Sequence, residues 1–159
     1  GSMGTAAVQI AKHLGSHVTG VCSTKNLDLV RSLGADNVID YTQDDFTRNG
    51  QTYDMIFDTV GKSSFEACKP ALTAQGRYLT SAGGLREFRQ MFWTAMRGGK
   101  KVITGVSSEK QEDLEIIRDW VEAGVLKPVI DRCYPLEEIV EAHRYVDSGH
   151  KRGNVVITV

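Results

Sequence analysis

The stretch that decides the fold is GTAAVQIAK at residues 4–12, followed by HVTGVC at residues 17–22. Apolar residues recur at helical spacing in the first part and predict a helix from about Thr5 to Leu14, with Leu14 on its apolar face and Gly15 ending it. The second part is short and apolar, which predicts a strand. A helix that leads directly into a strand is typical of the βαβ units around a parallel sheet.

The rest of the chain repeats this alternation. We predict further strands at 38–41, 53–58, 77–81, 100–106, 129–134 and 154–159, and further helices at 25–33, 64–72, 111–123 and 136–148. Large apolar residues at 88–96 lack strand alternation and predict a partly helical segment against a pocket or an interface. Leu114, Ile117 and Val121 are expected to point inward. The chain is therefore predicted to be a single α/β domain over residues 1–159, with a doubly wound parallel sheet of the Rossmann type.

Composition limits the possible partners. The 159 residues carry a formal net charge of −1 without a block of like charges, so neither nucleic acid nor a membrane is expected as a partner. The short basic cluster of Arg97, Lys100 and Lys101 is interpreted as a solvated strand edge. The three cysteines are far apart and have apolar neighbours, which indicates buried thiols and a reducing, cytoplasmic setting.

The stretch at 4–12 resembles the helix after the glycine loop in quinone-oxidoreductase-like members of the medium-chain dehydrogenase/reductase superfamily, which are also alcohol dehydrogenase-like. Further matches follow in order along nearly the whole chain: CSTK at 22–25, LGAD at 33–36, YDMIFDTVG at 53–61, SGHK at 148–151 and GNVV at 153–156. The resemblance implies an NADP(H)-dependent oxidoreductase whose small-molecule substrate is held by a separate domain. It also implies a Rossmann-type fold that here lacks its usual first strand, and a homodimer through the edge strand at 100–106.

The first part of the expected cofactor site lies near the start of the chain. Gly4 is expected at the N-terminal end of the first helix, where free backbone N–H groups and the helix dipole favour a pyrophosphate. NAD-binding domains place an acid after the second strand, but this chain has Ser23, Thr24 and Lys25 there. Hydroxyls and a lysine suit a 2′-phosphate, and the resemblance adds Tyr41 to them, so NADP(H) is the expected cofactor.

The second part follows two later strands. The resemblance places Asp58, Val60 and Gly61 beside the nicotinamide and its ribose, with Ser81 and Gly83 on the other side. Asp58 has an alternative role, the capping of the following helix.

The resemblance also indicates a pyrophosphate contact at Asn154, where relatives often carry a basic residue. Asn154 cannot supply a charge, and Lys151 or Arg152 could replace that residue.

No catalytic residue and no metal ligand is assigned. The four histidines lack ligand spacing, and zinc-dependent relatives take their ligands from the segment before the glycine loop. Hydride transfer needs little acid–base chemistry from this part of the protein, because the cofactor supplies the reactive carbon. Two alternatives are a non-catalytic nucleotide-binding or interaction fragment and a methyltransferase, although the latter would place an acid where Ser23, Thr24 and Lys25 stand.

The last expectation concerns the vacant first-strand position. It would lie between the strands at 17–22 and 53–58, and unpaired buried backbone groups there would be costly, about 1–3 kcal/mol each. The segment at 155–159 is β-branched and apolar, as a central strand should be. We therefore expect it to insert into that position, within its own chain or swapped into a neighbour.

Overall fold

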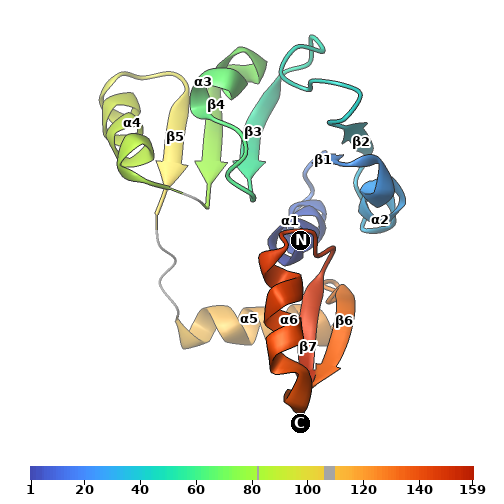
Figure 1. The fold of residues 1–159 in the computed structure, drawn as a ribbon. Helices are drawn as coiled ribbons and strands as arrows, with labels where there is room; N and C mark the ends of the chain where they lie inside the picture. Colours follow the sequence, from blue (N-terminus) through green and yellow to red (C-terminus); the bar gives the residue numbers. More distant parts are fainter. Residues whose placement is uncertain (82, 106–109) are drawn as a thin grey trace. The chain divides into compact units, whose positions relative to one another are not determined.

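The computed structural model describes residues 1–81, 83–105 and 110–159. The chain forms two compact units, Gly1–Asp40 with Glu109–Val159, and Tyr41–Ser108. Helices and parallel strands alternate through both units, which confirms the α/β class (Figure 1). The expectation of one domain over residues 1–159 stays a prediction.

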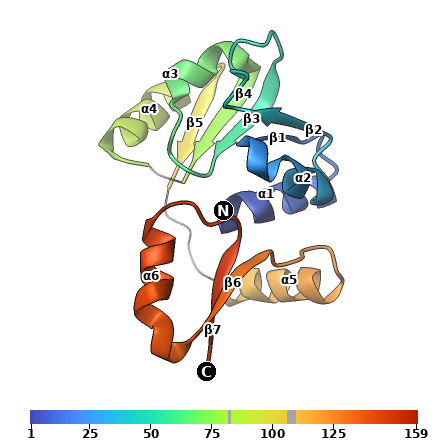
Figure 2. The same cartoon turned by 45° about the vertical axis from the view of Figure 1, so that its right-hand side comes forward.

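The first unit holds two parallel strand pairs, β1–β2 and β6–β7. Helix α6 contacts strand β7 and lies beside that pair (Figure 2). The elements in chain order are α1 (Ser2–His13), β1 (Thr19–Cys22), η1 (Thr24–Asn26), α2 (Leu27–Ser32), β2 (Asn37–Asp40), α5 (Gln111–Glu122), β6 (Ile130–Pro135), η3 (Leu136–Glu138), α6 (Ile139–Asp147) and β7 (Asn154–Thr158). Gly15, Gly34 and Gly124 follow α1, α2 and α5 with positive φ, as expected of residues that end helices.

The second unit is a three-stranded parallel sheet in the order β3–β4–β5. Its elements are β3 (Tyr53–Asp58), α3 (Phe65–Cys68), η2 (Lys69–Ala71), β4 (Leu72–Thr80), α4 (Leu85–Met96) and β5 (Lys101–Thr104). The buried core of this unit consists of Phe65, Cys68, Leu72, Tyr78 and Val102. The segment expected to be partly helical is helix α4, and it borders a pocket as expected. The strand expected at 100–106 ends at Thr104, and Val106 lies outside the described residues.

Several faces that were expected to be inward are exposed. Leu14 is 68% exposed, and the buried residues of α1 are the polar Thr5 and Gln9. The side-chain amide of Gln9 explains this, because its Nε2 donates to the Lys127 carbonyl at 3.1 Å and its Oε1 accepts from the Lys127 N–H at 2.9 Å. These two hydrogen bonds satisfy the backbone groups of Lys127, which belongs to no strand. The face of α1 that carries Gln9 is therefore buried, although it is polar.

Four other expectations of burial are also wrong. Leu114, Ile117 and Val121 on α5 are exposed, and so is Cys133, whereas Cys68 is fully buried as expected. Met55 and Phe57 are exposed as well and leave one face of β3 open. The helix expected at 64–72 is only the short α3 and η2, and the strand expected at 77–81 begins at Leu72. Hydrophobic periodicity identified the other elements within a few residues but could not show which apolar faces another element covers.

The C-terminal strand does not occupy the expected position within its own chain. Strand β7 pairs in parallel with β6, with Arg132 opposite Val155 and Tyr134 opposite Ile157. Among the described residues, β1 pairs only with β2, and β3 only with β4. Insertion of 155–159 beside 17–22 or 53–58 in the same chain is therefore wrong, because β6 supplies the partner that the sequence did not reveal. The swapped arrangement stays a prediction.

Candidate dinucleotide site

The first cluster surrounds the start of α1. Gly4 lies in the first turn of this helix rather than ahead of it, so its backbone N–H is one of the groups that have no partner within the helix. The Lys151 ammonium donates to the Ser2 hydroxyl at 2.7 Å and to the Gly153 carbonyl at 3.2 Å. A cation thus lies at the positive end of a helix dipole, so both the ammonium group and the helix dipole would attract an anion there. Relatives often carry a basic residue at the position of Asn154, and Lys151 is one of the two residues expected to replace it.

The second cluster is the turn after β1. Ser23 is the N-cap position of η1 and accepts a hydrogen bond from Asn26, while Thr24 donates to the Asp40 carboxylate. Lys25 is exposed, and within the described ranges its ammonium has no carboxylate within 4.0 Å. The turn therefore offers hydroxyls and a charge, as the sequence predicted.

The structure adds Arg152 and Asp40 to this turn. The Arg152 guanidinium donates to the Asn26 side chain and to the Lys25 carbonyl, both at 2.9 Å. Asp40 is the last residue of β2 and lies opposite Cys22 in the parallel register. The sequence named Arg152 only as a possible pyrophosphate contact and did not place it at this turn, because it is 127 positions away from Lys25. Asp40 was not assigned to the site, because it belongs to the neighbouring strand. The turn thus holds two cations and one carboxylate.

The structure also places Asn154 and Tyr41, two further residues of the expected cofactor site. The Asn154 side chain donates to the Val129 carbonyl at 3.1 Å and so joins β7 to the segment before β6. Tyr41 directly follows Asp40 in the chain, and its ring is 62% exposed. Tyr41 is the first residue of the second unit.

In the second unit, the Asp58 carboxylate organises the loop after β3. Its Oδ1 accepts from the N–H groups of Val60 at 3.0 Å and Gly61 at 2.7 Å, and its Oδ2 accepts from the Ser63 N–H at 2.9 Å and the Tyr78 hydroxyl at 3.1 Å. Burial alone would raise the pKa of Asp58, but these hydrogen bonds outweigh it and hold that pKa below its usual value. Burial, together with the adjacent Asp58 charge, raises the pKa of Tyr78.

The cap of the next helix is Ser64, whose hydroxyl accepts from the Ala67 N–H at 3.3 Å. Asp58 therefore does not cap α3 itself but holds the residues that lead into it.

The expected nicotinamide-side residues lie at adjacent strand ends. Ser81 follows β4, and its N–H donates to the Asp58 carbonyl at 3.3 Å. Val60 is exposed, and Gly61 has φ +73°, a conformation that favours glycine. A Cβ on Gly83 would lie 1.8 Å from the Thr104 hydroxyl oxygen, so glycine is required there for packing against β5. Asp58, Val60, Gly61, Ser81 and Gly83 thus belong to one edge of the β3–β4–β5 sheet.

The described residues contain no group of three or more His, Cys, Asp or Glu side chains arranged to hold a metal ion. The first unit carries a lysine at a helix start, and the second unit, by itself, carries a glycine-containing loop at its strand ends. Within the described part of the chain, none of the helices has the length and apolar character to cross a membrane.

Comparison with known proteins identifies the family of the chain. The zinc-binding dehydrogenase family model matches residues 33–157. Mouse "NAD(P)H oxidoreductase RTN4IP1, mitochondrial" is 34% identical over all of this chain and 46% of its own length. The "Trans-enoyl reductase pgmF" of Aspergillus terreus (strain NIH 2624 / FGSC A1156) is 32% identical over all of this chain and 49% of its own length.

A solved quinone oxidoreductase from Coxiella burnetii superposes with a TM-score of 0.86 at 25% identity, covering 99% of this chain and 50% of that one. The chain spans about half the length of the curated relatives it matches. The parallel α/β architecture is that of the Rossmann-like domain of these enzymes. The chain belongs to the zinc-binding dehydrogenase family of the medium-chain dehydrogenase/reductase superfamily and is quinone-oxidoreductase-like.

Proposed function

We propose that this chain binds NADP(H) and is the cofactor-binding part of an oxidoreductase that transfers hydride to a carbonyl, a quinone or an activated alkene. The observation that carries the proposal is the gathering of Lys25, Lys151 and Arg152 around the start of α1 and the turn after β1. When bound, the nicotinamide supplies the hydride, and the protein supplies position and electrostatics. The names of the relatives, which include a quinone oxidoreductase and an enoyl reductase, support this substrate class.

Each cation has a separate role in the proposed site. Lys151 and the first N–H groups of α1, Gly4 included, would hold the pyrophosphate. Lys25 and Arg152, with the hydroxyls of Ser23 and Thr24, would hold the 2′-phosphate, for which the family resemblance also names Tyr41. Asp40 opposes this preference by its charge, but its carboxylate accepts a hydrogen bond from the Thr24 hydroxyl.

The loop of the second unit would receive the nicotinamide end. Asp58 is a positioning residue in this proposal, because its carboxylate is used by the loop and by Tyr78 rather than left open to a ligand. Val60, Gly61, Ser81 and Gly83 would offer backbone atoms at the carboxyl ends of the strands, where open α/β sheets bind ligands.

Calorimetric titration with NADPH and NADH tests the proposal. NADPH should bind at least tenfold more tightly than NADH, and Lys25→Glu should abolish or reverse that ratio because it places a carboxylate beside the 2′-phosphate. Lys110→Glu, an exposed lysine at the N-cap of α5, is the matched charge control. Equal affinity for both cofactors in the unmodified chain would refute the NADP(H) assignment. Failure to bind either would favour the alternative of a non-catalytic interaction fragment.

The proposal includes a homodimer in a cytoplasmic, reducing compartment. Among the described residues, β5 pairs with β4 on one side only, and Ile103 on this strand is exposed. An unpaired strand edge favours pairing with a second copy. Sedimentation should give the mass of two chains, and Ile103→Lys should shift that mass toward one chain.

The free cysteines agree with the proposed reducing compartment. Some relatives carry mitochondrial or chloroplastic names, so cell fractionation is the measurement that tests a cytoplasmic location.

A further inference from the structure

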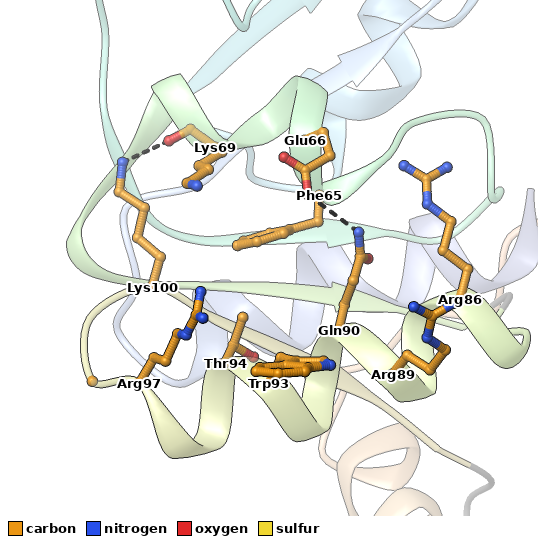
Figure 3. Close-up of a pocket in the computed structure, with 11 residues that line it drawn as sticks. Phe65, Glu66, Lys69, Arg86, Arg89, Gln90, Trp93, Thr94, Arg97 and Lys100 are labelled. Atoms are coloured by element: carbon orange, nitrogen blue, oxygen red, sulfur yellow. Dashed lines mark hydrogen bonds between the residues drawn. The ribbon is translucent and has the colours of Figure 1, made fainter.

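A groove of about 520 Å³ lies in the second unit between α3–η2 and α4 (Figure 3). Five cationic side chains line it: Lys69, Arg86, Arg89, Arg97 and Lys100. Lys69, Arg97 and Lys100 lie at one end of the groove, and Arg86 and Arg89 at the other (Figure 3). This concentration is a local feature, because the whole chain carries a formal net charge of −1.

The triple-cation end is separate from the expected cofactor site. Lys69 precedes β4, and Arg97 and Lys100 precede β5, so these side chains belong to the amino ends of the parallel strands. Asp58 and Ser81 stand at the carboxyl ends of β3 and β4, the opposite edge of the same sheet. A ligand held by the triple-cation end is therefore not the nicotinamide end of the cofactor.

The charges of the groove are not neutralised by the protein. Within the described ranges, none of the five cations has a carboxylate within 4.0 Å. The single lining carboxylate, Glu66, accepts a hydrogen bond from Gln90 at 3.3 Å. Lys100 donates to the Lys69 carbonyl at 2.6 Å, which fixes its ammonium beside that backbone. Like charges gathered in a concave site attract anions, and a bound anion relieves their mutual repulsion.

The groove is also partly preorganised. Arg86, Arg89, Trp93 and Arg97 are spaced three or four residues apart, so they share one face of α4. The Arg97 guanidinium carbon lies 5.1 Å from the centroid of the Trp93 ring, a cation–π contact that restricts the arginine. Arg89 and Arg97 are about 12 Å apart along the helix axis at 1.5 Å per residue. A single phosphate cannot reach both ends, whereas an extended anion can.

We propose that this groove binds a ligand with two or more phosphate groups, held by Lys69, Arg97 and Lys100 at one end and by Arg86 and Arg89 at the other. Guanidinium groups match phosphate oxygens in charge and in hydrogen-bond geometry. The phosphates come from a free polyphosphate-type metabolite or from lipid headgroups, and the experiment distinguishes these sources. The proposal does not depend on the NADP(H) assignment, because it uses other residues.

The test is calorimetric titration of the full chain with inorganic tripolyphosphate, with inorganic phosphate as comparison. Tripolyphosphate should bind at least tenfold more tightly than phosphate. The Arg97→Gln, Lys100→Gln pair should weaken tripolyphosphate binding at least tenfold, and the Arg86→Gln, Arg89→Gln pair should also weaken it. Lys110→Gln with Lys127→Gln, two exposed lysines outside the groove, should leave it unchanged. Circular dichroism checks that each variant folds.

A second readout uses the tryptophan of the groove. The chain has two tryptophans, so Trp120→Phe leaves Trp93 as the sole fluorescent reporter. Tripolyphosphate should change the fluorescence of Trp93, and the midpoint of that titration should agree with the midpoint found by calorimetry. Vesicles of phosphatidylglycerol form the other arm: co-sedimentation that the groove variants abolish assigns the phosphates to lipid, and solution binding alone assigns them to a free polyanion. The proposal is wrong if neither probe binds, or if the groove variants and the control pair behave alike.

Discussion

The turn after β1 in the first unit and the loop after β3 in the second differ in how their charges are used. At the turn, Lys25 is exposed without an ion pair in the described part of the chain, and the Arg152 guanidinium donates to two neutral oxygens, those of the Asn26 side chain and the Lys25 carbonyl. In the loop, both oxygens of Asp58 are occupied by protein donors. The turn is therefore available to a ligand, whereas Asp58 is committed to the fold. Substitutions should accordingly change cofactor affinity at the turn and stability at the loop.

The largest effect is expected from Asp58→Ala. It removes the acceptor of the buried Tyr78 hydroxyl and of three loop N–H groups, so we expect a loss of about 3 kcal/mol in the free energy of unfolding. Asp54→Ala on the same strand is the control, because its carboxylate accepts one exposed hydrogen bond, from Thr73. Urea denaturation measures both. Equal losses in the two variants would mean that Asp58 does not organise the loop.

Gly83→Ala should cost slightly less, about 1–3 kcal/mol of unfolding free energy, because the new methyl group overlaps the Thr104 hydroxyl. Combining it with Thr104→Ala should recover part of the loss. Gly84→Ala is the matched control, since its nearest neighbour would be the Glu87 carboxylate at 3.4 Å. Full stability of Gly83→Ala would show that this position serves the ligand rather than the packing of β5.

At the turn, Arg152→Ala should weaken NADPH binding about tenfold, or about 1.4 kcal/mol, while the unfolding midpoint stays almost constant. Calorimetry measures the affinities for NADPH and NADH. If Arg152→Ala weakens NADH as much as NADPH, Arg152 does not face the 2′-phosphate.

Asp40→Asn should act in the opposite direction and strengthen the binding of NADPH relative to that of NADH about threefold, because it removes the carboxylate beside Thr24. The same calorimetric titrations measure this ratio of affinities.

The smallest expected effect is the acid dependence of stability at the loop. The pKa of Asp58 is lower in the folded chain than in the unfolded one, so its contribution to stability is present above the unfolded value of about 3.9 and is lost as the pH falls through the folded value. In Asp58→Asn this loss is absent. Urea midpoints between pH 3 and 7 should therefore fall less steeply for the variant, while Asp36, Asp45 and Asp131 titrate in both. Parallel curves would contradict the argument.

The sequence by itself determined most of the local elements and the chemistry of the turn after β1. The strand at 53–58 lies where its apolar run predicts it, and α1 and α2 end before Gly15 and Gly34. Lys25 and the neighbouring hydroxyls are local features of one turn, and they could be recognised for that reason. Such features depend on interactions a few residues apart, which periodicity and turn chemistry describe.

Only the tertiary structure decided which distant segments meet. It placed Arg152 beside Lys25, paired β7 with β6, and gathered cations from positions 69 to 100 into one groove. It also turned Gln9 rather than Leu14 inward, because a carboxamide could satisfy the backbone of Lys127. The physical reason is that these contacts depend on crossovers and on the pairing of buried polar groups, which no local pattern of hydrophobicity or charge encodes.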